Sequence, residues 1–229
     1  MSEQKPYIII SLGGSIMVPD GVDAPFLKAF TGLIKEKVAD GYRFVIITGG
    51  GKICRMYQNA LKEFADPSSD DLDWLGIHVT RLNANLLRLA FGKLAHGEVV
   101  TDPTSVPKTD RPIIIGAGWK PGWSTDYDAI VIAGILGAHR VVNLSNIDYV
   151  YTEDPRKNPN AQAIHDSTWA DFRALLPEKW DPGLSAPFDP VAAAEAQNLR
   201  LELAIMNGRD IANLRNYLEE KGFNGTVIR

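Results

Sequence analysis

The strongest constraint on the fold is a pair of apolar runs near the start of the chain that each end in glycines. Residues Tyr7–Leu12 run into Gly13-Gly14-Ser15, and Phe44–Ile47 run into Thr48-Gly49-Gly50-Gly51-Lys52. A buried strand followed by glycines and a helix start presents bare backbone N–H groups, and the helix N-terminus adds partial positive charge. Each turn therefore suits an anion, and two such turns predict a site that holds more than one phosphate.

Neither turn matches the familiar phosphate-binding fingerprints. A Walker A loop needs Ser or Thr after its lysine, whereas Lys52 is followed by Ile53. The dinucleotide pattern G-x-G-x-x-G is absent from both turns, and the segment 116–122 has one residue too many. Taken alone, either turn could also be an ordinary tight turn of an α/β sheet.

Apolar periodicity predicts strands and helices that alternate along most of the chain. We expect helices over 24–40, 52–65, 72–91, 126–136, 167–176, 190–197 and 210–221. Strands are expected over 7–12, 44–48, 98–101, 112–115, 140–144, 201–205 and 226–228, with part of a hairpin at 149–151. This alternation predicts a three-layer, doubly wound α/β fold with a mostly parallel sheet and helices on both faces. Ligands of such folds bind beyond the carboxyl ends of the strands, where the glycine turns lie.

Composition excludes several classes of protein. The chain has 229 residues, 45% of them apolar, and a net charge of −4, which gives no support for nucleic-acid or membrane binding. The first residues lack the apolar core of a signal peptide, and Cys54 is the single cysteine, so neither a disulfide framework nor a Cys-rich zinc site is expected. We expect a cytoplasmic protein.

Two cations follow the second glycine turn. Lys52 and Arg55 lie three residues apart, on one face of the predicted helix start. Cations are unfavourable at a helix N-terminus unless an anion lies between them and the helix, which favours a phosphate site over a solvated pair. Arginine can grip a phosphate with two parallel hydrogen bonds, while lysine acts as a point charge.

Further polar residues precede predicted helices or lie in a connection. Ser124, Thr125 and Asp126 lie at one helix start, and Asp189 precedes another that begins at Pro190; helix capping explains each equally well. The connection 146–156 carries several hydrogen-bonding groups and two tyrosines. No general base is evident, and phosphoryl transfer to an ionised phosphate does not need one.

Taken in order, these segments resemble the amino acid kinase superfamily and, within it, the UMP (uridylate) kinases of the archaeal-like type. The similarity covers essentially the whole length. The matching segments are Gly13-Gly14-Ser15, Gly49-Gly50-Gly51-Lys52 with Arg55, 73–77 with 80–84, Pro121-Gly122 with 124–126, 146–148 through 154–157, Asp189-Pro190, Met206-Asn207-Gly208 and Gly225-Thr226.

The resemblance implies one domain over 1–229, with an acceptor-binding half at about 1–122 and an ATP-binding half at about 123–229. It implies a kinase that transfers the ATP γ-phosphoryl to UMP, as a homohexamer that uses Mg²⁺ held mainly by the nucleotide phosphates rather than by protein ligands. The implied roles are these: Gly50, Gly51 and Arg55 for the UMP phosphate, Asp73 for the ribose, Thr125 and Ser124 near the uracil, Gly13, Gly14 and Ser15 for the transferring phosphoryl group, Asn146, Tyr151 and Asp154 for ATP, and Asp189 with Lys52 and Arg55 for catalysis.

Three residues depart from the pattern of the superfamily. Ser11 stands where many members carry a lysine, so Lys52 is the expected substitute. Ala194 replaces a lysine in the Asp-Pro-x-Ala-Ala motif, and Tyr149 replaces a glycine. Three alternatives therefore stay open: a sibling kinase acting on another small acid or phosphate, a non-catalytic protein that stores oxyanions such as molybdate or tungstate, and a regulatory nucleotide-binding subunit.

Overall fold

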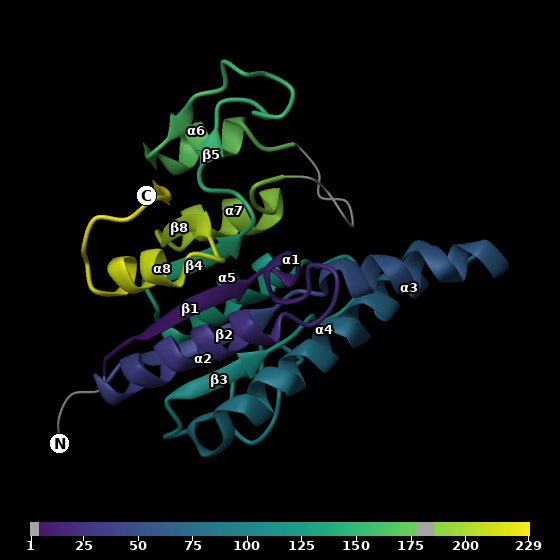
Figure 1. The fold of residues 1–229 in the computed structure, drawn as a ribbon, viewed down its shortest axis with the longest axis horizontal. Helices are drawn as coiled ribbons and strands as arrows, with labels where there is room; N and C mark the ends of the chain where they lie inside the picture. The colour runs from purple at the N-terminus through teal and green to yellow at the C-terminus, as the bar shows by residue number, and fades with distance from the viewer. Residues whose placement is uncertain (1–4, 178–185) are drawn as a thin grey trace.

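A seven-stranded sheet forms the centre of the molecule, described here from a computed structural model over residues 5–177 and 186–229. The strand order is β3-β2-β1-β4-β8-β9-β7 (Figure 1). The strands are β1 Tyr7–Leu12, β2 Arg43–Thr48, β3 Ile113–Gly116, β4 Arg140–Ser145, β7 Asp166–Ser167, β8 Glu202–Asn207 and β9 Thr226–Ile228. Only the pairing of β9 with β8 is antiparallel among these strands. The predicted mostly parallel sheet is thus confirmed.

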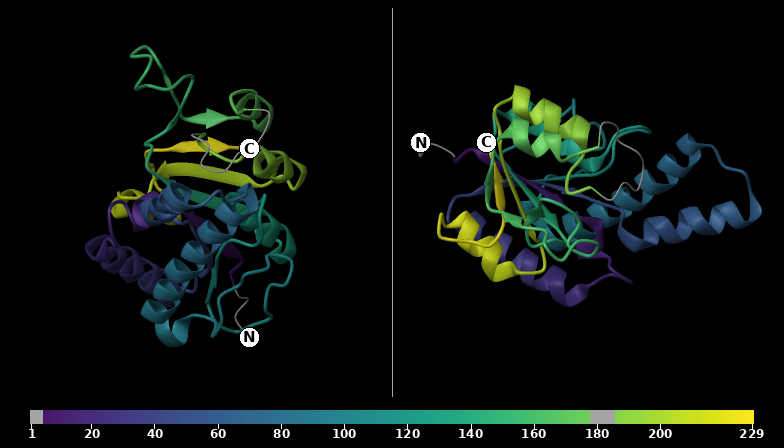
Figure 2. Two further views of the ribbon diagram at one scale, coloured as in Figure 1. Left: turned by 90° about the vertical axis from the view of Figure 1, so that its right-hand side faces the viewer. Right: turned by 90° about the horizontal axis from the view of Figure 1, so that it is seen from above.

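Helices cover both faces of this sheet, as Figure 2 shows. They are α1 Gly14–Met17, α2 Ala24–Ala39, α3 Gly51–Phe64, α4 Ser69–Phe91, α5 Thr125–Leu136, α6 Trp169–Ala174, α7 Pro190–Asn198 and α8 Ile211–Leu218, with a 3₁₀ turn η1 at Gly92–Leu94. Alternate residues of β1 face opposite ways: Ile8 and Ile10 join the core under α2, α4 and α8, and Ile9 joins the core under α5 and α7. The predicted three-layer α/β fold is confirmed.

A pair of long helices, α3 and the start of α4, projects beyond the sheet (Figures 1 and 2). The turn between them ends in a capping box, in which Ser68 Oγ accepts from Asp71 N at 3.1 Å and Asp71 Oδ2 accepts from Ser68 N at 2.9 Å. No residue of α3 is buried, although it carries Met56, Tyr57 and Phe64. This helix pair therefore presents apolar side chains to solvent.

Several element boundaries differ from the sequence prediction. The expected strand at 98–101 is reduced to one bridge between Val100 and Gly116, because within this segment only Val100 pairs with the edge of β3; a second isolated bridge joins Ala95 to Ile113. The short α1 was not predicted, since one turn is too short for periodicity to reveal. The helix expected over 167–176 spans Trp169–Ala174, with Thr168 as its cap. The predicted hairpin at 149–151 is found as β5 Val150–Tyr151, antiparallel to β6 Ala163–Ile164.

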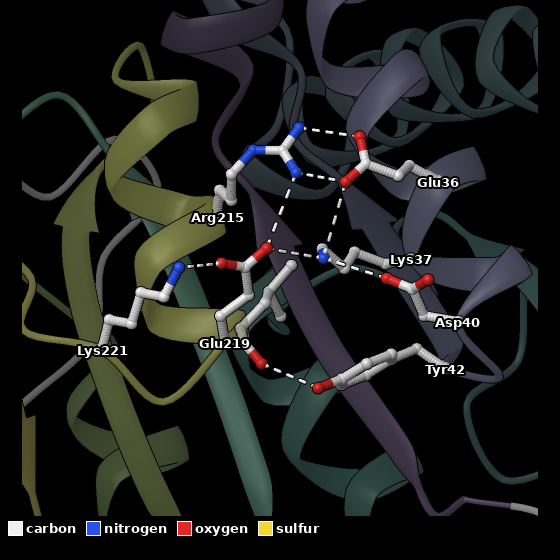
Figure 3. Close-up of polar contacts among 8 residues, drawn as sticks. Glu36, Lys37, Asp40, Tyr42, Arg215, Glu219 and Lys221 are labelled. Atoms are coloured by element: carbon white, nitrogen blue, oxygen red, sulfur yellow. Dashed lines mark hydrogen bonds and ion pairs between the residues drawn. The ribbon is translucent and has the colours of Figure 1, made fainter.

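A buried cation joins α2 to α8 (Figure 3) near the amino ends of the strands, whereas the glycine turns lie at the carboxyl ends. Lys37 is 4% exposed, and its Nζ lies 2.7 Å from Glu219 Oε1 and 3.0 Å from Asp40 Oδ2. Lys221 and Lys37 both donate to the Glu219 carboxylate, and they lower its pKa to about 2. Arg215 extends the network to Glu36. The network connects helices that are far apart in the sequence.

In the part of the chain that the structure describes, no helix is long and apolar enough to cross a membrane.

Candidate active site

The two glycine turns meet at the carboxyl ends of β1 and β2. A side chain at Gly14 would place its Cβ 2.0 Å from the nitrogen of Gly51, and one at Gly49 would lie 2.5 Å from the nitrogen of Gly14. Gly51 also has φ +70°, a left-handed conformation that favours glycine. The close approach brings two helix starts together, α1 after Gly13 and α3 after Gly50. These two helix starts lie together at the place where the sequence predicts an anion site.

The two predicted cations lie in the first turns of α3. Lys52 is anchored by its backbone N–H, which donates to Val18 O at 3.1 Å, and its ammonium pairs with Asp20. The side chain is 58% exposed. Arg55 is exposed one turn further along, near Cys54, whose pKa burial raises and Arg55 partly lowers. Both side chains are therefore at the surface near the glycine turns, and that of Lys52 is paired with Asp20.

Asp126, which the sequence predicts only as part of a helix start, lies at the end of β1. Asp126 Oδ1 accepts a hydrogen bond from Ser11 Oγ at 2.8 Å and another from Asn143 Nδ2 at 3.0 Å. Burial raises the pKa of Asp126 to about 6, and the charge of Asp189 contributes in the same direction. Ser11, the residue that departs from the superfamily, is thus bonded to a carboxyl group with a high pKa.

The predicted residues Ser124 and Asp189 are brought together although 65 positions separate them. Ser124 Oγ donates to Asp189 Oδ2, and it accepts from Tyr127 N at 3.1 Å as the cap of α5. Asp189 Oδ1 accepts from Val191 N at 2.6 Å and Ala192 N at 3.1 Å as the cap of α7. The capping interpretation is confirmed for both residues. Their mutual contact also joins two helix N-termini at one place, with Thr125 beside them as the first residue of α5.

Asp73 is joined to the same region from α4. Its Oδ2 accepts from Gly122 N at 2.9 Å, which ties the projecting helix to the loop before Ser124. This bond joins Asp73 of α4 to a residue that lies two positions before Ser124 along the chain, close to the start of α5.

Asp128 is a second buried carboxylate, and the sequence patterns did not indicate it as a site residue. It is 1% exposed, and its Oδ2 accepts from Trp119 N at 3.2 Å, while Oδ1 has no partner among the described residues. Burial raises the pKa of Asp128 to about 8, and the nearby charges of Asp126 and Asp102 add to this effect. Arg81 donates to Trp119 O at 3.1 Å, so side chains of α4 and α5 bind the backbone oxygen and nitrogen of Trp119. A single acidic residue one turn inside an apolar helix carries no distinctive sequence signal.

The predicted ATP residues line a separate cavity of about 570 Å³ on the β4 side of the glycine turns. Its walls come from the connection 145–156, with Leu175, Ala186 and Pro187. Asn146, Tyr151 and Asp154 all lie in this wall. Arg156 donates two side-chain hydrogen bonds to Asp154, at 3.0 and 3.1 Å, and thereby lowers the pKa of its carboxyl group. The cavity is thus adjacent to the carboxyl end of β4, beside β1.

The fold and the paired glycine turns define an amino acid kinase, and the comparison with known families agrees. The Amino acid kinase family is matched over residues 6–207, and the chain belongs to this family.

Among its relatives are particular kinases. The chain is 36% identical over 228 residues to a uridylate kinase from Methanospirillum hungatei, covering 97% of this chain and 94% of the relative. It is 34% identical over 224 residues to a uridylate kinase from Thermococcus onnurineus, covering 96% and 98%. The crystal structure of uridylate kinase from Archaeoglobus fulgidus superposes with a TM-score of 0.82 at 25% identity, covering 97% of this chain and 99% of that chain.

Proposed function

We propose that this protein transfers the γ-phosphoryl group of ATP to a phosphate oxygen of UMP and forms UDP. The observation that carries the proposal is the contact between the two glycine turns, which brings two helix N-termini together, with Lys52 in the first turn of α3. The uridylate kinases named above, similar over almost the whole chain, support UMP as the acceptor.

We assign the acceptor phosphate to Gly50, Gly51 and Arg55, and the ribose to Asp73, whose second carboxylate oxygen is available beside the one that binds Gly122 N. The uracil would lie near Thr125 and Ser124. Gly13, Gly14 and Ser15 would hold the transferring phosphoryl group between acceptor and donor.

The donor nucleotide would occupy the 570 Å³ cavity, with Asn146, Tyr151 and Asp154 as its ligands. Cavities of this size suit small molecules and cofactors. Asp189 would organise the site through Ser124 and the N-terminus of α7.

Catalysis in this arrangement is positioning together with charge neutralisation. The acceptor phosphate is already ionised, so no side chain has to remove its proton. Lys52, Arg55 and the glycine N–H groups would balance the charge on the equatorial oxygens during in-line transfer.

We propose that magnesium enters this site as a companion of ATP. Mg²⁺ commonly keeps phosphate oxygens and waters as ligands, with few from protein. The ion would neutralise charge on the donor phosphates, and the residues named above would orient them.

We further propose that copies of the chain assemble through the projecting helices, and a hexamer is the expected assembly. Large apolar side chains are exposed on both helices: Met56, Tyr57 and Phe64 on α3, and Trp74, Leu82, Leu86 and Leu89 on α4. The apolar face of α2, in contrast, is buried in the core, so α4 rather than α2 offers exposed apolar side chains to a second copy. The predicted cytoplasmic location stays a prediction.

The test is ADP production from ATP and Mg²⁺ with a panel of acceptors: UMP, CMP, AMP, acetylglutamate, carbamate and isopentenyl phosphate. Turnover confined to UMP is the expected result. Turnover with another acceptor would point to a sibling kinase. No turnover with any of them, from folded protein, would favour oxyanion storage or a regulatory subunit, and the metal content of the purified protein would distinguish these two.

A further inference from the structure

The connection between α1 and α2 carries two carboxylates, and each of them pairs with a cation near the glycine turns. Asp20 pairs with Lys52, and Asp23 Oδ2 lies 3.6 Å from Arg209 Nη1. Lys52 lowers the pKa of Asp20, and Arg209 adds a smaller effect, so both cations act on this connection. None of the roles assigned above involves Asp20, Asp23 or Arg209.

Arg209 lies on the donor side of the site. It follows β8, and Gly208 N donates to Ser145 O at 2.8 Å, at the carboxyl end of β4 where the cavity wall begins. A Cβ at Gly208 would lie 3.2 Å from the side chain of Ile16, so this turn packs directly on the helix that follows Gly13. In the sheet, β2 lies on one side of β1, and β4 and β8 lie on the other. Lys52 and Arg209 therefore follow strands on opposite sides of β1, the strand that ends at Gly13, and both pair with the connection between α1 and α2.

We propose that Arg209 binds the polyphosphate of the donor nucleotide, and that Asp20 and Asp23 are counter-ions which Lys52 and Arg209 exchange for phosphate. This inference rests on the proposed kinase function and adds the residues that govern donor affinity. It also gives the donor side a cation in a chain whose Ala194 replaces the lysine of the superfamily motif.

The exchange is easy because both cations are accessible to solvent. The side chains of Lys52 and Asp20 are 58% and 83% exposed, and those of Arg209 and Asp23 are 49% and 23% exposed; pairs with such accessible members contribute little to stability. A triphosphate carries more charge than one carboxylate, and it can accept several hydrogen bonds from a guanidinium group. The carboxylates would therefore weaken donor binding while keeping both cations near the turns.

The test measures binding of inorganic tripolyphosphate and of ADP to the whole protein by titration calorimetry at low salt, without acceptor. Arg209→Met should weaken both ligands by about tenfold or more, as expected for loss of a charge-assisted hydrogen bond. Asp23→Asn should strengthen binding by about 1.5- to 5-fold, the range of an exposed ion pair. Asparagine retains the cap that Asp23 Oδ1 provides to Phe26 N, so the fold of α2 is preserved.

Double variants show whether each carboxylate acts through its partner. The gain from Asp23→Asn should vanish in an Arg209→Met background, and the gain from Asp20→Asn should vanish in a Lys52→Met background. Arg229→Met is the control, because Arg229 makes a comparable exposed pair with Glu202 at 2.9 Å, outside this region. Its affinity for both ligands should equal that of the parent.

Wild-type affinity in Arg209→Met would overturn the inference, as would gains that persist in the double variants. A parent protein that does not bind either ligand would overturn it as well. If the parent binds both ligands, the variants behave as expected and no acceptor is phosphorylated, the proposed kinase function fails and the assignment of Arg209 stands.

Discussion

Ser11 Oγ donates a 2.8 Å hydrogen bond to Asp126 Oδ1, which joins the end of β1 to the first turn of α5. A hydroxyl cannot compensate the charge of this carboxylate as a lysine at the same position would. Asn143 adds a second neutral donor at 3.0 Å. Among the described residues, Asp126 therefore has no cation as a hydrogen-bond partner, and burial raises its pKa to about 6 although the bonds from Ser11 and Asn143 act in the opposite direction.

Asp126→Asn should make the stability of the protein less dependent on pH. The folded pKa of about 6 lies above the ordinary value of 3.8, so the folded state holds this proton more tightly, and ionisation destabilises it as pH rises from about 4 to 6. The variant removes this cost, which is at most about 3 kcal/mol, and the amide oxygen of the new side chain can still accept from Ser11 and Asn143. Urea unfolding at pH 4 and pH 7.5 checks this. An equal difference between variant and parent at both pH values would contradict it.

Lys52→Met should reduce the turnover number about a hundred- to a thousandfold, equivalent to about 2.7–4 kcal/mol of transition-state stabilisation. The reason is that Lys52 is the cation nearest to the glycine turns at the start of α3, where Ser11 offers no charge. Steady-state ADP release with saturating ATP and UMP is the measurement. Lys62→Met, near the far end of the same helix, is the matched control and should behave like the parent. A turnover number within threefold of the parent would refute the role of Lys52.

Gly14→Ala should destabilise the protein by about 1–3 kcal/mol, because its Cβ would lie 2.0 Å from Gly51 N and force the two turns apart. Gly32→Ala is the control. No atom lies within 4 Å of a Cβ at Gly32, which is inside α2, so alanine should stabilise by about 0.5–1 kcal/mol. Denaturant unfolding of both variants gives the comparison. Equal effects would show that the turns are not tightly packed.

Asp189→Asn should lower turnover without a large loss of stability. Asparagine can still accept from Val191 N and Ala192 N and cap α7, but it loses the charge that faces Ser124 and the two helix N-termini. Turnover and the midpoint of thermal unfolding are measured together. A variant that unfolds, or one with full activity, would mean that Asp189 serves only as a cap.

Glu219→Gln should destabilise the protein at neutral pH, with the difference from the parent fading in acid. Lys221 and Lys37 lower the pKa of Glu219 from 4.5 to about 2, so its contribution is complete above pH 4.5 and is lost as pH falls towards 2. Unfolding in urea between pH 2.5 and 7 measures it. Glu220→Gln is the control, since Glu220 is 74% exposed and pairs with Arg140 only at 3.3 Å. A difference that persists unchanged to pH 2.5 would contradict the ion-pair explanation.

Much of the fold could be predicted because local patterns determine it. The buried runs of β1, β2 and β4 are continuous and apolar, as expected for strands covered on both faces. Ser68, Ser124, Asp189 and Asp210 each cap a helix where the sequence shows a capping residue. The prediction of a strand at 98–101 was wrong because an apolar run does not show how many of its residues pair with the edge of a sheet, and here only Val100 does.

The site could be predicted only where a motif spans adjacent residues. The glycine turns and Lys52 are visible in the sequence, and their contact follows from β1 and β2 being neighbours. The bond of Ser11 with Asp126 spans 115 positions, and the ion pair of Asp23 with Arg209 joins residues near opposite ends of the chain. Each is a single polar residue in an ordinary context, and tertiary structure alone brings it to its partner.

The projecting pair of helices has a mechanical consequence. Helix α3 begins at the second glycine turn and carries Lys52 and Arg55 in its first turns. Its 14 residues extend about 21 Å away from that glycine turn. A body of that length acts as a lever: a small tilt imposed on Phe64 at its outer end rotates the whole helix, including its base. Whatever binds the apolar side chains along α3 would thus set the angle at which the two cations approach their anion.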